Sequence, residues 1–243
     1  MRRMYKTIGI VGGMGPAATA DLMKKITDMT DADCDQEHIH LLIDSNVNIP
    51  DRTAAILHGG KDPVPEMLAA AKRLESIGAD FLIMPCNTAH WFIPALESEV
   101  GIPFLNMPAE TAALLKSMDV ETAAVLATDG TVQSGLYEEA LRAEGISAIY
   151  PDDEQQKTVM SLIYDYIKRG TLDPAQLPHD EMAAICSSLR ERGATAILLA
   201  CTELPVAFSL MGLYEDDCVD PTSVLAGAAI RKAGAQLRPG VRY

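Results

Sequence analysis

The sequence lacks long apolar runs and an excess of positive charge. None of its apolar stretches approaches the roughly 18 residues that a membrane-spanning helix needs, so we expect no membrane segment. The formal net charge is −14 at pH 7, and a field of this sign repels phosphates. The charge therefore argues against nucleic acids and anionic membranes as partners. A small anionic ligand stays possible, provided that cations are placed locally to meet it.

A disulfide framework is also missing from the sequence. The chain has five cysteines, an odd number, and no two of them form a Cys-x-x-Cys pair. This pattern is typical of a reducing compartment, and we expect a cytoplasmic protein. The apolar stretch Ile8–Val11 is followed at once by Gly12 and Gly13, so we do not expect a cleaved secretory signal.

The chain repeats itself with an offset of 115 residues. This shift carries Glu66-Met67-Leu68-Ala69 onto Glu181-Met182-Ala183-Ala184, and it carries Cys86 onto Cys201. It also carries the apolar segment that begins at Thr7 onto the one that begins at Thr122 without a gap. A register this long indicates a duplicated αβ unit.

Each half contains the same order of elements, which predicts the fold class. The expected strands are Thr7–Val11, Phe81–Met84, Thr122–Ala127 and Ala196–Leu199, with further short strands at His38–Asp44, Pro103–Asn106, Ser147–Tyr150 and Cys218–Asp220. The expected amphipathic helices are Glu66–Ile77, Glu181–Arg192 and Glu154–Arg169, and Pro108 and Pro221 each open another. Continuous apolar strands that alternate with helices predict an α/β protein of two pseudo-symmetric lobes, each with a mostly parallel sheet flanked by helices. The repeat restarts near Lys116–Glu121, so we expect lobes at 1–117 and 118–220.

Two cysteines follow the ends of equivalent strands, where ligands of parallel α/β sheets bind. Cys86 and Cys201 are each followed by hydroxyl or amide side chains and by the start of a helix. Two such thiols suit the inversion of a stereocentre, because one removes a proton from one face of a carbon while the other returns a proton to the opposite face. The alternative is that each cysteine is a small core residue, which is our interpretation of Cys186, inside an amphipathic helix.

Three motifs together resemble the aspartate/glutamate racemase family, which works without pyridoxal phosphate. They are Gly12–Pro16, Pro-Cys-Asn-Thr-Ala-His at 85–90, and Ala-Cys-Thr-Glu-Leu-Pro at 200–205. The resemblance implies an active site in the cleft between the lobes, with Cys86 and Cys201 as the acid/base pair and with no cofactor or metal. The first loop and Glu203 differ from the Asp-Ser-Gly and His that glutamate racemases typically carry there, so the chain is more similar to the aspartate racemase branch.

The same resemblance implies which residues hold a small amino-acid substrate. They are Met14, Arg52, Asn87, Thr88, Thr131, Lys168 and Thr202. Among them, Arg52, in a loop after the second strand, and Lys168 would bind the distal carboxylate, and a guanidinium suits a bidentate grip on such a group. The resemblance further implies a homodimer, and a final segment from about 221 to 243 that returns to the first lobe.

Several alternatives stay open from the sequence. The substrate is aspartate in the leading hypothesis, but glutamate, a broader range of amino acids or another cysteine-dependent isomerase reaction fits the same motifs. A sensor that binds an amino acid without turnover is a non-enzymatic alternative. A nucleotide-binding module fits the Gly13-x-Gly15-x-x-Ala18 pattern, although Asp44 lies too late for the usual acidic residue. His38 and His40 lack a third ligand for a metal.

Overall fold

The computed structural model describes residues 5–241 and divides the chain into two compact units. The first unit runs to Glu110 and resumes at Thr222, and the second is Thr111–Pro221. The division falls inside helix α5 (Met107–Ser117) rather than after residue 117. Most of helix α11 (Pro221–Ala233) belongs to the first unit.

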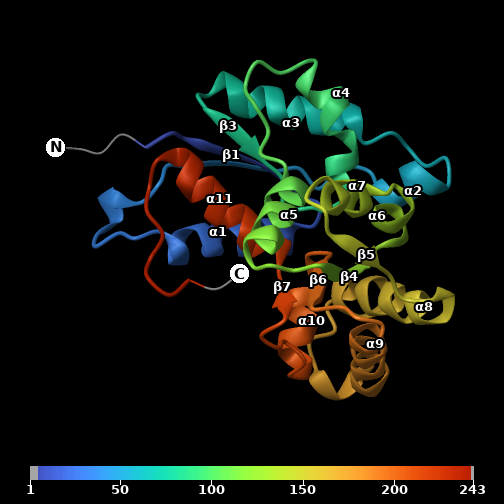
Figure 1. Cartoon of the computed structure of the whole chain (residues 1–243). Helices are drawn as coiled ribbons and strands as arrows, with labels where there is room; N and C mark the ends of the chain where they lie inside the picture. Colours follow the sequence, from blue (N-terminus) through green and yellow to red (C-terminus); the bar gives the residue numbers. More distant parts are fainter. Residues whose placement is uncertain (1–4, 242–243) are drawn as a thin grey trace. The chain divides into compact units, whose positions relative to one another are not determined.

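A three-stranded parallel sheet forms the centre of the first unit. Its strands are β1 (Ile8–Gly12), β2 (Leu41–Ser45) and β3 (Phe81–Ile83), in the order β2-β1-β3. Helices α1 (Pro16–Met29) and α11 pack on one face of this sheet, and α3 (Val64–Ser76) and α4 (Ile93–Glu97) pack on the other (Figure 1). Both faces are therefore covered, which explains why β1 is buried at every position.

A four-stranded parallel sheet forms the centre of the second unit. Its strands are β4 (Thr122–Ala127), β5 (Ser147–Ile149), β6 (Ala196–Ala200) and β7 (Cys218–Val219), in the order β5-β4-β6-β7. Helices α8 (Asp153–Ser161), α9 (His179–Glu191) and α10 (Glu203–Met211) share one apolar core with β4 and β6. The remaining elements are η1 (Asp35–Glu37), α2 (Arg52–Leu57), η2 (Thr88–Phe92), α6 (Asp129–Gln133), α7 (Leu136–Ala143), η3 (Leu162–Tyr166), η4 (Ile167–Arg169) and η5 (Pro174–Gln176).

The internal repeat is visible in the register of the two sheets. Ile8 of β1 pairs with Phe81 of β3, and Ala123 of β4 pairs with Ala196 of β6, so both partners shift by the same number of residues. Helices α3 and α9 begin and end at positions related by the same shift. The prediction of two parallel α/β sheets built from one duplicated unit is confirmed.

Three expected elements differ from the prediction. Residues 103–106 form only an isolated bridge, between Phe104 and Leu82, because Pro103 has no N–H to extend a ladder. The second strand begins at Leu41 instead of His38. The helix expected over Glu154–Arg169 is divided into α8, the π-helical turn η3 and the 3₁₀ turn η4.

No helix among residues 5–241 is long and apolar enough to cross a membrane. This finding agrees with the absence of long apolar runs in the sequence.

The glycine loop after β1 generates a stability prediction. Gly13 has a φ of +92°, and a Cβ there would lie 2.3 Å from the backbone carbonyl of Asn46. Gly13→Ala must therefore adopt a left-handed backbone and also displace a neighbouring backbone segment. We expect a loss of roughly 2–4 kcal/mol in the free energy of unfolding, measured by urea titration.

Gly145→Ala is the matched control. Gly145 has a φ of +76°, but a Cβ added there would meet no other atom within 4 Å, so only the backbone penalty of about 1 kcal/mol applies. Equal losses in the two variants would contradict the close approach of Asn46 to Gly13.

Candidate active site

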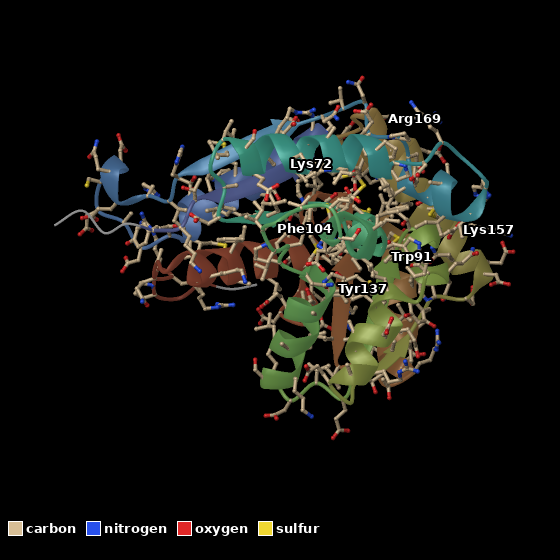
Figure 2. The ribbon with its side chains drawn as sticks, turned by 90° about the horizontal axis from the view of Figure 1, so that it is seen from above. Lys72, Trp91, Phe104, Tyr137, Lys157 and Arg169 are labelled. Atoms are coloured by element: carbon tan, nitrogen blue, oxygen red, sulfur yellow. The ribbon has the colours of Figure 1, made fainter. Side chains whose placement is uncertain are left out.

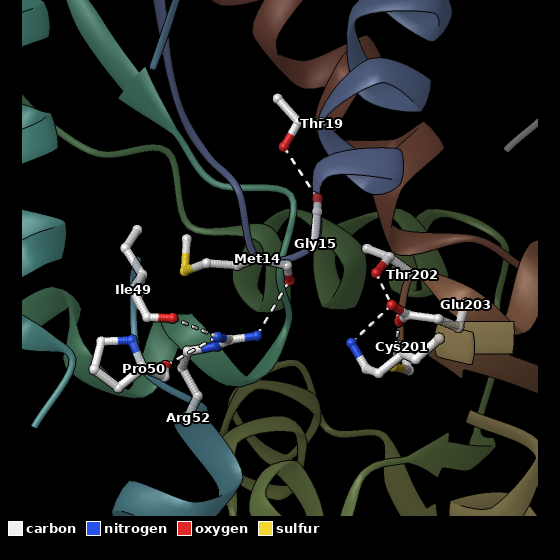
Figure 3. Close-up of polar contacts among 10 residues, drawn as sticks. Met14, Gly15, Thr19, Ile49, Pro50, Arg52, Cys201, Thr202 and Glu203 are labelled. Carbon is white, nitrogen blue, oxygen red and sulfur yellow. Dashed lines mark hydrogen bonds and ion pairs between the residues drawn. The ribbon is translucent and has the colours of Figure 1, made fainter. Parts of the chain in front are cut away.

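Cys201 lies directly after β6 and is 8% exposed. The following residues turn the chain into α10, whose first residue is Glu203. The Cys201 thiol donates a hydrogen bond to Glu203 Oε2 at 3.0 Å, and the Thr202 hydroxyl donates to the same oxygen at 2.9 Å (Figure 3). One carboxylate oxygen of Glu203 thus accepts from both the thiol and the hydroxyl.

Lys168 binds the other oxygen of the same carboxylate. Its Nζ donates to Glu203 Oε1 at 2.8 Å, and the two side chains are 26% and 12% exposed. By contrast, Lys157 and Arg169 are about 70% exposed or more and form ion pairs within their own segment (Figure 2). Lys168 is therefore a partly buried cation and not a solvated charge at the end of a helix.

The broken helix explains the position of Lys168. The π turn η3, which precedes η4, contains more residues per turn than an α-helix. The side chains that follow it therefore point in other directions than those of a continuous α-helix. Lys168 then lies with its Nζ 5.5 Å from the ring centre of Tyr164. Gly170, in the left-handed region with a φ of 84°, ends the segment.

The pKa values of Cys201 and Glu203 are shifted in opposite directions by their surroundings. Burial, together with the nearby Glu203 carboxylate, raises the pKa of Cys201 well above its usual value. Burial alone would raise the pKa of Glu203 as well, but the Lys168 ammonium and the hydrogen bonds from Lys168, Cys201 and Thr202 lower it below its usual value. In this structure, Cys201 therefore holds its proton and Glu203 is ionised.

Cys86 occupies the corresponding place in the first unit. It follows β3 after Met84 and Pro85, and like Cys201 it is 8% exposed. Asn87 and Thr88, which follow it, are buried at the start of η2.

His90 fixes the backbone of the Cys86 loop. Its Nδ1 lies 2.9 Å from the carbonyl oxygen of Cys86. Burial lowers the pKa of His90 to about 4, so the ring is neutral at pH 7, and its Nδ1 carries the hydrogen because a carbonyl can only accept. The imidazole is thus a neutral support of this loop.

Arg52 and Met14 are brought together in the first unit. Arg52 is the first residue of α2 and not part of a loop as expected, because the Asp51 side chain caps this helix by accepting from the Ala54 N–H. The Arg52 guanidinium donates to the carbonyl oxygens of Pro50 at 2.9 Å and Met14 at 3.3 Å (Figure 3). It therefore ties the loop after β1 to the segment after β2.

Thr131 lies in the short helix α6, which follows β4. It is 1% exposed, and its hydroxyl lies 3.2 Å from that of Thr128, the N-cap of the helix. The shift of the repeat makes this segment the counterpart of the glycine loop after β1.

Each unit therefore holds part of the predicted site. Cys201, Thr202 and Lys168 come together in the second unit, and Met14 and Arg52 come together in the first, where Cys86, Asn87 and Thr88 also lie. In the sequence, Glu203 stands out only as a difference from glutamate racemases, and its contacts with Cys201 and Lys168 were not predicted. The sequence feature that could have indicated a role for Glu203 is its position two residues after Cys201. The chain has few cations to balance the charge of such a carboxylate.

The alternative sites gain no support from the geometry. Across residues 5–241, no three His, Cys, Asp or Glu side chains group as metal ligands. Asp44, the candidate for a nucleotide ribose, forms an ion pair with Arg73 at 2.7 Å.

Comparisons with known proteins agree with the motifs. A family model described as Asp/Glu/Hydantoin racemase matches residues 11–229. The chain is 37% identical to the aspartate racemase of Picrophilus torridus, with a TM-score of 0.84 and 96% of both chains covered. It is 29% identical to the broad specificity amino-acid racemase RacX of Bacillus subtilis, over 81% of this chain and 85% of the relative.

More distant structures share the fold alone. An aspartate racemase homologue from Pyrococcus horikoshii is 24% identical, with a TM-score of 0.76 and coverage of 94% of this chain and 99% of that one. A family model that spans nearly the whole chain, together with a relative that is similar over its full length, leaves one conclusion. The chain belongs to the Asp/Glu/hydantoin racemase family and is an isomerase.

Proposed function

We propose that this isomerase is a cofactor-independent racemase of aspartate in which Cys86 and Cys201 act as the two acid/base residues. The observation that carries the proposal is the equivalence of the two thiols. Cys86 follows β3, which pairs with β1, and Cys201 follows β6, which pairs with β4 in the same register. Both cysteines are 8% exposed. One symmetric pair of groups serves both directions of a racemisation.

The proton balance of the proposed reaction is simple. One cysteine, as a thiolate, takes the α-proton, so that a C–H bond breaks and an S–H bond forms. The other cysteine, as a thiol, gives its proton to the opposite face of the same carbon and becomes the thiolate. The raised pKa of Cys201 keeps its proton in place, so Cys201 is ready to act as the proton donor, and after donation its thiolate is the base for the reverse direction. The mechanism requires both thiols to reach one α-carbon in the working enzyme.

The substrate is held by the remaining candidate residues. Arg52 and Lys168 are cations near Met14 and Cys201 respectively, and we assign the distal carboxylate to them. The amide and hydroxyl groups that we assign to the amino group and the α-carboxylate are those of Asn87, Thr88, Thr131 and Thr202. Homodimer formation and a cytoplasmic location stay predictions from the family resemblance and the cysteine content.

A broader substrate range is the second candidate. The relatives include a protein named as a broad specificity amino-acid racemase beside one named as an aspartate racemase. Lys168 also already has a carboxylate partner within the protein, so its charge is not reserved for an acidic substrate.

The substrate test is proton exchange in heavy water. With L-aspartate, we expect NMR to show replacement of the α-proton by deuterium, together with loss of optical activity, because both follow from the same abstracted proton. Glutamate, alanine and asparagine are assayed in parallel. Exchange of all four at similar rates would favour the broad range, and no exchange of any amino acid would refute the proposed function.

Single cysteine variants test the two-base assignment. We expect Cys86→Ala and Cys201→Ala each to lower the racemisation rate at least ~1,000-fold. Racemisation needs a base on one face of the α-carbon and an acid on the other, and each variant lacks one of these two groups. Exchange of the α-proton of one enantiomer is expected to survive in the variant that keeps the base for that face.

Cys186→Ala is the matched control for this experiment. Cys186 is buried in the core of the second unit, on α9, so its replacement is expected to cost about 1 kcal/mol of stability without loss of turnover. Loss of turnover in a folded Cys186→Ala protein would show that the cysteine assignment is wrong.

A further inference from the structure

Glu203 has a position that the proposed reaction does not explain. Its side chain is 12% exposed, and each of its oxygens has a separate partner. Oε1 accepts from Lys168 at 2.8 Å, whereas Oε2 accepts from the Cys201 thiol at 3.0 Å. One partly buried carboxylate thus connects the proposed substrate cation to the proposed acid/base thiol.

The chemistry of this carboxylate matches that of an acidic substrate. The side-chain carboxylate of aspartate needs a cation in a protein with a net charge of −14, and Lys168 already pairs with a group of the same kind. Binding of such a substrate to Lys168 must therefore weaken or replace the pair with Glu203. A neutral amino acid brings no competing charge, so its binding leaves the pair intact.

The same carboxylate acts on the thiol. A carboxylate within hydrogen-bond distance disfavours the thiolate by charge repulsion and holds the thiol as its donor. The other titratable groups that act electrostatically with Cys201 are Lys168, which favours the thiolate, and the buried Tyr137 of α7, whose own pKa is raised by burial (Figure 2). Tyr137 is neutral, so Glu203 and Lys168 are the charges that set the state of this thiol.

We propose that Glu203 is a specificity-determining and positioning residue that competes with the substrate carboxylate for Lys168 and keeps the proton on Cys201. The inference rests on the proposed function for its substrate, but its effect on the thiol is independent of turnover. In the absence of an acidic ligand, the Glu203 carboxylate occupies Lys168 in place of the ligand carboxylate. Occupation of Lys168 by Glu203 limits the affinity for acidic amino acids, and the bond to Oε2 orients the thiol.

The first measurement is the reactivity of Cys201 in Glu203→Gln. Iodoacetamide labelling at a series of pH values, read for the Cys201 peptide by mass spectrometry, gives the midpoint of thiolate formation. Loss of the repelling charge leaves Lys168 to act on the thiol alone, so we expect this midpoint to fall by about one pH unit or more. An unchanged midpoint in a protein with the wild-type circular dichroism spectrum would overturn the proposal.

The second measurement is the affinity for two ligands of nearly equal shape. Titration calorimetry with L-aspartate and L-asparagine compares a carboxylate with a neutral amide. In Glu203→Gln we expect aspartate to bind roughly tenfold more tightly, with asparagine changed less than about twofold. An equal change for both ligands, or weaker binding of aspartate, would show that Glu203 is not a competitor for Lys168.

Two further variants keep the test decisive. Glu215→Gln removes the same charge from the same unit, where Glu215 pairs with Arg190 at 3.0 Å, and it is expected to alter neither readout. Glu203→Gln combined with Lys168→Gln removes both members of this partly buried ion pair if the single variant fails to fold. Its Cys201 midpoint is expected to lie below that of the wild type, because Glu203 contacts the thiol directly at 3.0 Å, whereas Lys168 binds the other carboxylate oxygen. A midpoint at or above the wild-type value would refute the proposal.

Failure of the two proposals can be told apart. If the wild-type protein exchanges no α-proton with any amino acid, the racemase proposal fails, but a lowered Cys201 midpoint in Glu203→Gln still supports the control of the thiol by Glu203. If the wild-type protein racemises aspartate and neither readout moves in Glu203→Gln, only the inference about Glu203 fails.

Discussion

Parallel pairing of strands in a repeated register is the constraint on which the rest of this structure depends. β1 with β3 and β4 with β6 align the carboxyl ends of their strands, and in each unit a cysteine follows the second strand of the pair. The apolar sides of helices hold these strands in place, on both faces of the first sheet and in the core that α8, α9 and α10 share with the second. Because side chains at such strand ends leave the sheet at its ligand-binding edge, the duplication produced two thiols at equivalent positions of the fold.

Electrostatics then makes the two equivalent positions different. The Cys201 thiol contacts the carboxylate of Glu203, which in turn binds Lys168. Burial together with this carboxylate raises the pKa of Cys201 and keeps its proton in place at neutral pH. The carbonyl oxygen of Cys86 is instead bonded by a neutral histidine. Two cysteines at equivalent positions of the repeat therefore have different polar neighbours.

Arg52 and Lys168 are two partly buried cations in an acidic chain. Both Arg52 and Lys168 are held by oxygen atoms of the protein itself, carbonyl groups in one case and a carboxylate in the other. A carbonyl oxygen accepts a hydrogen bond without carrying a formal charge, whereas the carboxylate of Glu203 neutralises the ammonium of Lys168. The two cations of the proposed substrate site therefore differ in the kind of group with which a ligand carboxylate must compete.

The sequence by itself determined the fold class, the duplication and the two cysteines, because apolar periodicity and a self-similar register are properties of neighbouring residues along the chain. Only the tertiary structure decided the surroundings of those cysteines. The division of the helix expected over Glu154–Arg169 depends on a π turn, which placed Lys168 on a carboxylate 35 residues away. Likewise, the capping of α2 by Asp51 placed Arg52 on the carbonyl of Met14, 38 residues earlier. Contacts over such separations arise from packing and charge in three dimensions, and local patterns do not contain them.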